Sequence, residues 1–320
     1  MLGLEKTKVY DFLNSLISMG FEVIAPVKTK DGINFEIIKN GKEVEMNYIN
    51  TVYSPKKFFI PDGEILFEYT LNGKPDIIEK VVKKRRVLFG IRPCDANGLL
   101  ALDKVLEKDP YYSSRRKNTL IIAVNCSETG ENCFCQSMRT DKLTGGFDLL
   151  LTDGGKTLVV DGYSERGKFM LKSFAETKVS KIKKMKNKRK FDSRDIEKRI
   201  LKIFNHKRWS EIAEKCLSCG ACTTACPTCY CFSVEDEPDF SKNGKRSRYW
   251  SFCMLMDFSR VAGDVVFRRS REDRCKQFVF HKLSYFKEEY GKHLCVGCGR
   301  CISICPTGID FFKEVEEMMK

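Results

Sequence analysis

The sequence contains no apolar run that approaches the roughly 18 residues of a membrane-spanning helix. Its first residues, MLGLEKTKVYDF, carry charges where a secretory signal peptide needs a continuous apolar stretch. We therefore expect no membrane span, and the simplest location for the chain is the cytoplasm.

Motifs that bind nucleotides or activate a serine are also missing. The sequence has no GxGxxG fingerprint of a dinucleotide fold, no GxxxxGK[ST] phosphate loop and no GxSxG nucleophile elbow. Only three histidines are present, His206, His281 and His293. These absences argue against a bound nicotinamide or flavin, and we predict no catalytic residue in this chain.

What the sequence has in abundance is cysteine, with 16 in a chain of 320 residues. Disulfides would explain such a number in a small secreted domain, but not in a cytoplasmic chain whose 42% hydrophobic content suffices for ordinary cores. The tight CxxC spacings instead favour metal binding. The net charge of +14 fits this interpretation, because negatively charged clusters would offset part of it and the rest could attract an acidic partner protein.

Eight of the cysteines lie in two copies of one string. CLSCGACTTACP spans 216–227 and CVGCGRCISICP spans 295–306, and each has the C-x2-C-x2-C-x3-C-P spacing of bacterial ferredoxins. Three cysteines of a tight loop can bind one cubane, while the fourth reaches the other cluster of the pair. We therefore predict two [4Fe-4S] clusters, whose iron is bound in cluster 1 by Cys216, Cys219, Cys222 and Cys305 and in cluster 2 by Cys295, Cys298, Cys301 and Cys226.

The glycines of the two strings support this prediction. Gly220, Gly297 and Gly299 would let the backbone turn close to sulfur and offer N–H groups to it. The alternative is a pair of structural zinc sites, but zinc ribbons use paired CxxC motifs rather than fourfold strings that each end in proline. The spacing thus favours iron–sulfur clusters, and two neighbouring clusters would relay electrons.

The region before the strings, residues 1–175, is predicted to be a mixed domain of the α/β or α+β class. A buried strand over 86–91, an amphipathic helix over 95–109 and a second strand over 118–126 predict a parallel β–α–β unit. Residues 147–162 are predicted to form a hairpin around a DGG turn.

The first 50 residues of this domain contain a helix signal and two turn signals. Residues 9–20 have a helical apolar pattern that Gly20 can end. Asp31-Gly32 and Asn40-Gly41 are each predicted to be the turn of a β-hairpin, because strand-like stretches flank them.

Residues 176–214 are predicted to be a basic linker and helix, since 180–190 contains seven basic residues. Such a run could bind nucleic-acid phosphates, but it has no interleaved aromatics and no nucleic-acid motif accompanies it. We expect a solvated linker or a subunit-docking surface, with no nucleic-acid partner. Residues 215–320 are predicted to form an α-helical, loop-rich dicluster ferredoxin-like domain with an insertion at 232–294.

Four further cysteines fall at one edge of the predicted parallel sheet. Cys94 and Cys126 each follow a strand of the β–α–β unit, and Cys133 and Cys135 come next in one loop. Sheets of this kind bind ligands at the carboxyl edge of their strands. These thiols could hold a third [4Fe-4S] cluster, which we favour over the alternative of buried, inert cysteines.

The last four cysteines follow no familiar spacing. Cys229 and Cys231 adjoin the turn of Cys226 and could share a further site with Cys253. Cys275 lies in a charged stretch and is expected to be a plain thiol.

Four segments in order resemble one known group of proteins. They are GIRPCDANGLLALDKVL, NCSETGENCFC, EKCLSCGACTTACPTCYCF and CVGCGRCISICPTGID. The chain resembles the beta subunit of soluble archaeal [NiFe] sulfhydrogenases and the related iron–sulfur subunit of anaerobic sulfite reductase. The resemblance covers most of the chain from about residue 50 onward, and RPCD and CPTCYCF are its more specific parts.

The resemblance implies an electron-transfer subunit of a soluble oxidoreductase complex. Its [4Fe-4S] clusters would relay electrons between a flavoprotein subunit that binds NAD(P)H and a catalytic subunit of the [NiFe] hydrogenase type. The equivalent subunit of an anaerobic sulfite reductase is an alternative, because both versions share these motifs. A further alternative is a catalytic iron–sulfur protein in its own right, with an open iron site in the N-terminal cluster.

Overall fold

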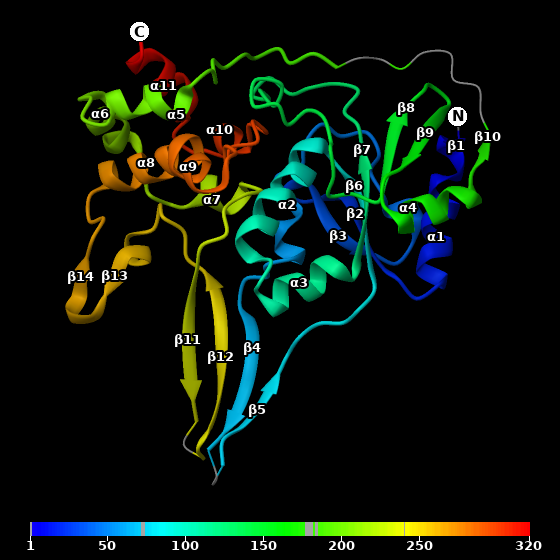
Figure 1. Cartoon of the computed structure of the whole chain (residues 1–320), viewed down its shortest axis with the longest axis horizontal. Coiled ribbons are helices and arrows are strands. Elements are labelled where there is room, and N and C mark those ends of the chain that lie inside the picture. Colours follow the sequence, from blue (N-terminus) through cyan, green and yellow to red (C-terminus); the bar gives the residue numbers. More distant parts are fainter. Residues whose placement is uncertain (1, 72–73, 177–181, 183–184, 240) are drawn as a thin grey trace.

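A computed structural model describes the chain except residues 1, 72–73, 177–181, 183–184 and 240 (Figure 1). Part of the predicted basic run therefore lies outside the described residues. Within the described part, no helix is both long and apolar enough to cross a bilayer.

The N-terminal half is built on an eight-stranded sheet with the order β10-β1-β9-β8-β7-β6-β2-β3. Its strands are β1 (Leu2–Glu5), β2 (Glu22–Thr29), β3 (Gly32–Ile38), β6 (Arg86–Ile91), β7 (Thr119–Val124), β8 (Leu149–Asp153), β9 (Thr157–Gly162) and β10 (Ala175–Glu176). Strands β2, β6, β7 and β8 pair in parallel, and the other pairs are antiparallel. The predicted β–α–β unit is confirmed, since β6 pairs in parallel with β7 and helix α2 (Pro93–Leu106) connects them.

Successive side chains along a strand point to opposite faces of this sheet, and each face packs into a separate hydrophobic core. Both faces are therefore buried. Val87 and Phe89 of β6 belong to the core under α1 (Val9–Ser18), whereas Leu88 belongs to the core under α2 and α3 (Pro110–Lys117). Helix α1 contributes Val9, Leu13 and Leu16, which is the helical spacing that the sequence predicted. The Figure 1 view shows α1 and the α2–α3 pair around the sheet, with α4 (Glu165–Met170) beside β8 and β9.

The turn predictions had different outcomes. The Asp31-Gly32 turn joins β2 to β3, and residues 147–162 form the β8–β9 hairpin, so both predictions are confirmed. The hairpin at Asn40-Gly41 is wrong, because these residues begin the 3-10 turn Gly41–Glu43. The Asn40 side chain accepts from the Lys42 N–H and the Glu43 carboxylate accepts from the Asn40 N–H, so a capping box replaces the hairpin turn.

A second sheet joins distant parts of the chain, with the order β11-β12-β4-β5. Strands β4 (Glu64–Thr70) and β5 (Asp76–Glu79) precede α2, whereas β11 (Phe232–Pro238) and β12 (Asn243–Trp250) lie between the two cysteine strings. The sheet extends away from the rest of the molecule (Figure 1). At its base, buried Arg248 of β12 pairs with Glu64 of β4. The predicted ranges 1–175 and 215–320 therefore share one sheet, and their division at 176–214 stays a prediction.

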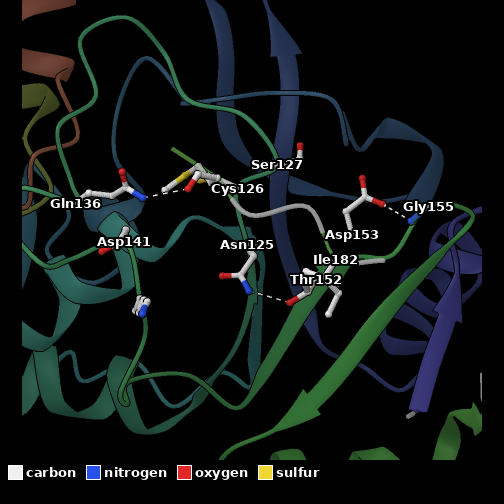
Figure 2. Close-up of a pocket in the computed structure, with 11 residues that line it drawn as sticks. Asn125, Cys126, Ser127, Gln136, Asp141, Thr152, Asp153, Gly155 and Ile182 are labelled. Carbon is white, nitrogen blue, oxygen red and sulfur yellow. Dashed lines mark hydrogen bonds between the residues drawn. The ribbon is translucent and has the colours of Figure 1, made fainter. Parts of the chain in front are cut away.

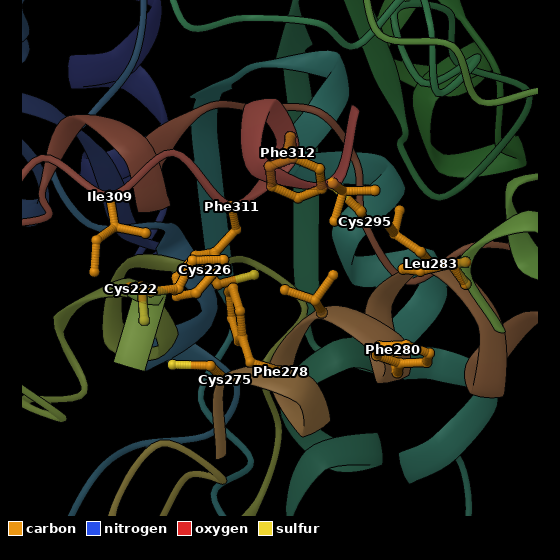
Figure 3. Packing of buried hydrophobic residues seen from close by; sticks show 14 of the residues in the cluster. Cys222, Cys226, Cys275, Phe278, Phe280, Leu283, Cys295, Ile309, Phe311 and Phe312 are labelled. Atoms are coloured by element: carbon orange, nitrogen blue, oxygen red, sulfur yellow. The ribbon is translucent and has the colours of Figure 1, made fainter. Parts of the chain in front are cut away.

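Short helices make up the C-terminal half. They are α5 (Ile196–Arg199), α6 (Arg208–Lys215), α7 (Ala221–Ala225), α8 (Arg271–Phe280), a π-helical turn (His281–Tyr285), α9 (Phe286–Tyr290), α10 (Arg300–Ser303) and α11 (Phe311–Met318), with a two-stranded ribbon of β13 (Arg260–Val261) and β14 (Val265–Val266). Their core contains thiols as well as apolar side chains, and Figure 3 shows Cys222, Cys226 and Cys295 among aromatic residues of this cluster.

One buried ion pair connects the two halves. Asp95, in the first turn of α2, accepts two hydrogen bonds of 2.6 and 2.9 Å from Arg300, and both side chains are almost completely buried. The Arg300 guanidinium also donates to the backbone and side-chain oxygens of Thr51. Removing either partner would leave the other as an uncompensated buried charge.

We expect Asp95→Asn to lower the free energy of unfolding by roughly 3–5 kcal/mol, because it leaves the Arg300 charge buried without its partner. The matched control is Glu36→Gln, which removes a half-exposed partner of Lys57 and should cost about 1 kcal/mol or less. Urea unfolding under anaerobic conditions measures both. Equal effects of the two variants would contradict a special role for the Asp95–Arg300 pair.

Candidate iron–sulfur centres

The loops of the two cysteine strings have the same backbone conformation. Ser218 and Gly297 occupy equivalent positions with φ of 51° and 62°, and Gly220 and Gly299 both have a φ of 75°. A left-handed φ is unusual for serine, so its recurrence at Ser218 indicates that the loop geometry is required there.

This conformation points backbone N–H groups at sulfur. Ser218 donates its N–H to the Cys216 sulfur at 3.4 Å, and Gly297 donates to the Cys295 sulfur at 3.4 Å. Hydrogen bonds of this kind stabilise thiolates and tune the groups bound to them. Of the three glycines expected to offer N–H groups to sulfur, Gly297 is seen to do so, and the equivalent N–H in the first string comes from Ser218.

The four thiols predicted for cluster 1 lie around one cavity. Cys216, Cys219, Cys222 and Cys305 line a space of about 330 Å³ together with Met254, Ile309 and Phe311. The Ile309 N–H donates to the Cys305 sulfur at 3.3 Å. Cys275, predicted to be a plain thiol, is fully buried next to Cys216, and this contact is the largest cause of the lowered pKa of Cys216.

The four thiols predicted for cluster 2 also lie near one another. Burial raises the pKa of Cys301, and the neighbouring thiols of Cys298, Cys295 and Cys226 raise it further. Cys226 comes from the first string and the other three from the second. The structure therefore brings together the exchanged set that the ferredoxin spacing predicted.

The four cysteines of the sheet edge converge as well. Cys94 lies in the first turn of α2, Cys126 follows β7, and the loop after it carries Cys133 and Cys135. All four line a cavity of about 350 Å³. Cys298 of the second string lines the same cavity, which the sequence did not predict.

Contacts with the second string and with the basic segment hold the 132–135 loop. A Cβ at Gly299 would lie 2.4 Å from the carbonyl oxygen of Asn132, so only glycine allows this approach. The Gln136 N–H donates to the Asn187 side chain, which also accepts from the Cys135 thiol. The described part of the basic segment therefore packs against the sheet-edge cysteines.

The remaining predicted cysteines, Cys229, Cys231 and Cys253, share a third thiol-lined cavity of about 260 Å³. In the described part of the chain, no three His, Cys, Asp or Glu side chains are arranged to hold a single metal ion. The thiols surround cavities instead of one point, which is the arrangement that a cluster of several atoms needs. Their cysteine chemistry, N–H donors and burial fit [4Fe-4S] groups.

An open cavity adjoins the sheet-edge thiols at the carboxyl ends of β7 and β8. It has about 1320 Å³ of empty space that is open to solvent, and Cys126, Asn125, Thr152 and Asp153 are among the residues that line it (Figure 2). Asn125 donates to the Thr152 hydroxyl at 2.8 Å. Cys126 therefore lines this open cavity as well as the cavity of the sheet-edge thiols.

Two lysines near the thiols are buried, which the sequence did not predict. Lys56 is 1% exposed and Lys282 is 3% exposed. No local signal could have revealed Lys56, because the adjacent Lys57 has the same chemistry and pairs with Glu36 at the surface.

The comparisons with known proteins agree with this geometry. A family model described as a 4Fe-4S dicluster domain matches residues 215–309. Sulfhydrogenase 2 subunit beta of Pyrococcus furiosus is 34% identical over 330 aligned residues, which cover 96% of this chain and 95% of that protein. No solved structure matches the chain. The resemblance to sulfhydrogenase beta subunits is confirmed, and the chain belongs to that family.

Proposed function

We propose that this iron–sulfur electron-transfer subunit works in the cytoplasm as a relay within a soluble hydrogenase-type complex. It would pass electrons between a flavoprotein subunit that binds NAD(P)H and a [NiFe] catalytic subunit. The name of the relative, which calls it part of a sulfhydrogenase, supports a place in a larger assembly. The equivalent role in an anaerobic sulfite reductase is the alternative, because the cysteine motifs do not distinguish the two.

The observation that carries this proposal is the continuity of the thiol groups. Cys219 is exposed beside Leu217 at one end. Cys298 contributes to the second ferredoxin-type group and also lines the sheet-edge cavity. Cys126 adjoins the open cavity at the other end. The groups therefore extend from one surface of the molecule to another.

The chain's own residues would bind the clusters and control their surroundings. [4Fe-4S] clusters supply one-electron transfer when bound, at potentials set by charge, hydrogen bonds and solvent exposure. Here Cys216, Cys219, Cys222 and Cys305 would bind the first and Cys295, Cys298, Cys301 and Cys226 the second. We propose Cys94, Cys126, Cys133 and Cys135 as ligands of a third. The Ser218 and Gly297 N–H groups would stabilise the sulfur charge, and aromatic packing would exclude water.

A second candidate function is catalysis at the sheet edge. The open cavity beside Cys126 favours it, because a small molecule could reach a cluster there. Substrate-dependent changes in the spectrum of the isolated chain would support this candidate, whereas the relay predicts none.

For the third cluster, we expect Cys94→Ala to lose about four irons and about four sulfides per chain relative to the wild type. Cys275→Ser is the matched control, since it also replaces a buried thiol that is no predicted ligand and keeps a hydrogen-bond donor beside Cys216. Iron and acid-labile sulfide, measured anaerobically, provide the readout. A Cys94→Ala protein that kept its full iron content would remove the ligand assignment at the sheet edge.

For the relay, we expect Cys298→Ala in the intact complex to abolish most NAD(P)H-linked turnover by the catalytic subunit. Turnover with a viologen dye should be retained, because the dye exchanges electrons with the catalytic subunit directly. Cys275→Ser, which keeps a hydrogen-bond donor beside Cys216, should leave both activities in place. If the isolated chain consumed hydrogen or reduced sulfite unaided, the relay would be the wrong assignment.

A further inference from the structure

Three cysteines that belong to neither the ferredoxin-type nor the sheet-edge groups line a separate cavity. Cys229 and Cys231 follow the turn of Cys226, Cys253 follows β12, and all three line one cavity. Its empty space of about 260 Å³ is comparable with the 330 and 350 Å³ at two of the other thiol groups. Cys229 and Cys253 are buried, and Cys231 is half-buried.

The wall of this cavity is mostly closed to water. Phe252, Phe278 and Leu294 supply its apolar part, and all three are almost fully buried. Thr228, Tyr230, His281 and Lys282 also line it, and the last two begin the π-helical turn His281–Tyr285. Such turns inside α-helices are frequently found at functional sites.

Two buried ammonium groups lie beside these thiols. Lys56 donates to the carbonyl oxygens of Thr223 and Cys229 at 2.9 and 3.1 Å, and Lys282 donates to the Thr228 hydroxyl at 3.1 Å. All of these acceptors are uncharged. Among the described residues, neither lysine forms an ion pair with a carboxylate.

A buried ammonium without a counter-charge costs several kcal/mol. The groups whose negative charge acts most strongly on Lys282 are the thiols of Cys226, Cys229, Cys295 and Cys253. For Lys56 they are Cys229, Cys226 and Cys231. The acidic groups closest to these buried lysines are therefore thiols, and Cys226 and Cys229 act on both lysines.

We propose that Cys229, Cys231 and Cys253 bind a fourth [4Fe-4S] cluster, with His281 as the ligand of its remaining iron. The inference rests on the proposed iron–sulfur function and adds a site to it. The buried lysines balance the negative charge of the cluster and its thiolates. The Nε2 of His281 lies 3.3 Å from the Tyr230 hydroxyl, which would orient the ring and leave Nδ1 for iron.

The position of this site makes it a branch of the relay. The Cys229 thiol forms a hydrogen bond with the Cys226 sulfur, and Cys226 belongs to the cluster 2 group. Burial raises the pKa of Cys222, which belongs to the cluster 1 group, and among the neighbouring thiols Cys253 raises it most. A cluster here would thus lie beside both ferredoxin-type centres.

The test compares the iron and sulfide of anaerobically prepared full-length chains. The wild type should contain about sixteen irons, and Cys253→Ala should lose about four irons and about four sulfides. Cys275→Ser, which keeps a hydrogen-bond donor beside Cys216, should lose none. Equal contents in Cys253→Ala and wild type would overturn the fourth cluster and leave the relay intact, whereas a wild-type chain without iron and sulfide would overturn both.

A second measurement tests the proposal even if the Cys253→Ala variant does not fold. Pulsed EPR of the reduced wild-type chain should show a nitrogen coupling from a cluster-bound histidine. His281→Cys, which keeps a ligand at this position, should retain the irons and lose the coupling. A wild-type spectrum without this coupling, or the same coupling in His281→Cys, would overturn the assignment.

Discussion

The structure depends most on the buried pair between Asp95 and Arg300. Asp95 directly follows Cys94, and Arg300 directly precedes Cys301, so one ion pair fixes the spacing between thiols of two different groups. Buried ion pairs rarely add net stability, but they are strongly directional, and breaking one is costly. The hydrogen bonds from Arg300 to Thr51 satisfy the rest of its guanidinium and attach a third segment to the same point. The pair thus gives the two halves a fixed relative position, which electron transfer between clusters bound by their cysteines would need.

Charge is distributed around the thiols in a consistent way. The cysteines are surrounded by apolar and aromatic packing, which would make an isolated thiolate costly. Backbone N–H groups from Ser218 and Gly297, together with the ammonium groups of Lys56 and Lys282, supply positive potential inside that packing. The basic surplus of the chain is therefore partly internal, and it lies where iron–sulfur groups would introduce negative charge.

The sequence predicted the features that depend on local chemistry. The spacing of the fourfold strings predicted which thiols gather, including the position of Cys226 near the second string, and strand order predicted the convergence of Cys94 and Cys126 at one edge. Two local features were missed, namely the capping box that Asn40 forms with Glu43 in place of a hairpin turn and the β11–β12 hairpin within the insertion. Features that depend on distant partners were not accessible. The burial of Lys56 depends on the Thr223 and Cys229 carbonyls far along the chain, which no local pattern reports.

The pairing of β4 with β12 has a consequence for how the polypeptide is made. Strand β4 leaves the ribosome well before β12, and until β12 emerges its edge has backbone groups with no partner. The first cysteine string is also synthesised before the second, so a ferredoxin-type group that takes cysteines from both strings could assemble only once both have been made. A fragment ending before β12 would expose an unpaired, aggregation-prone edge.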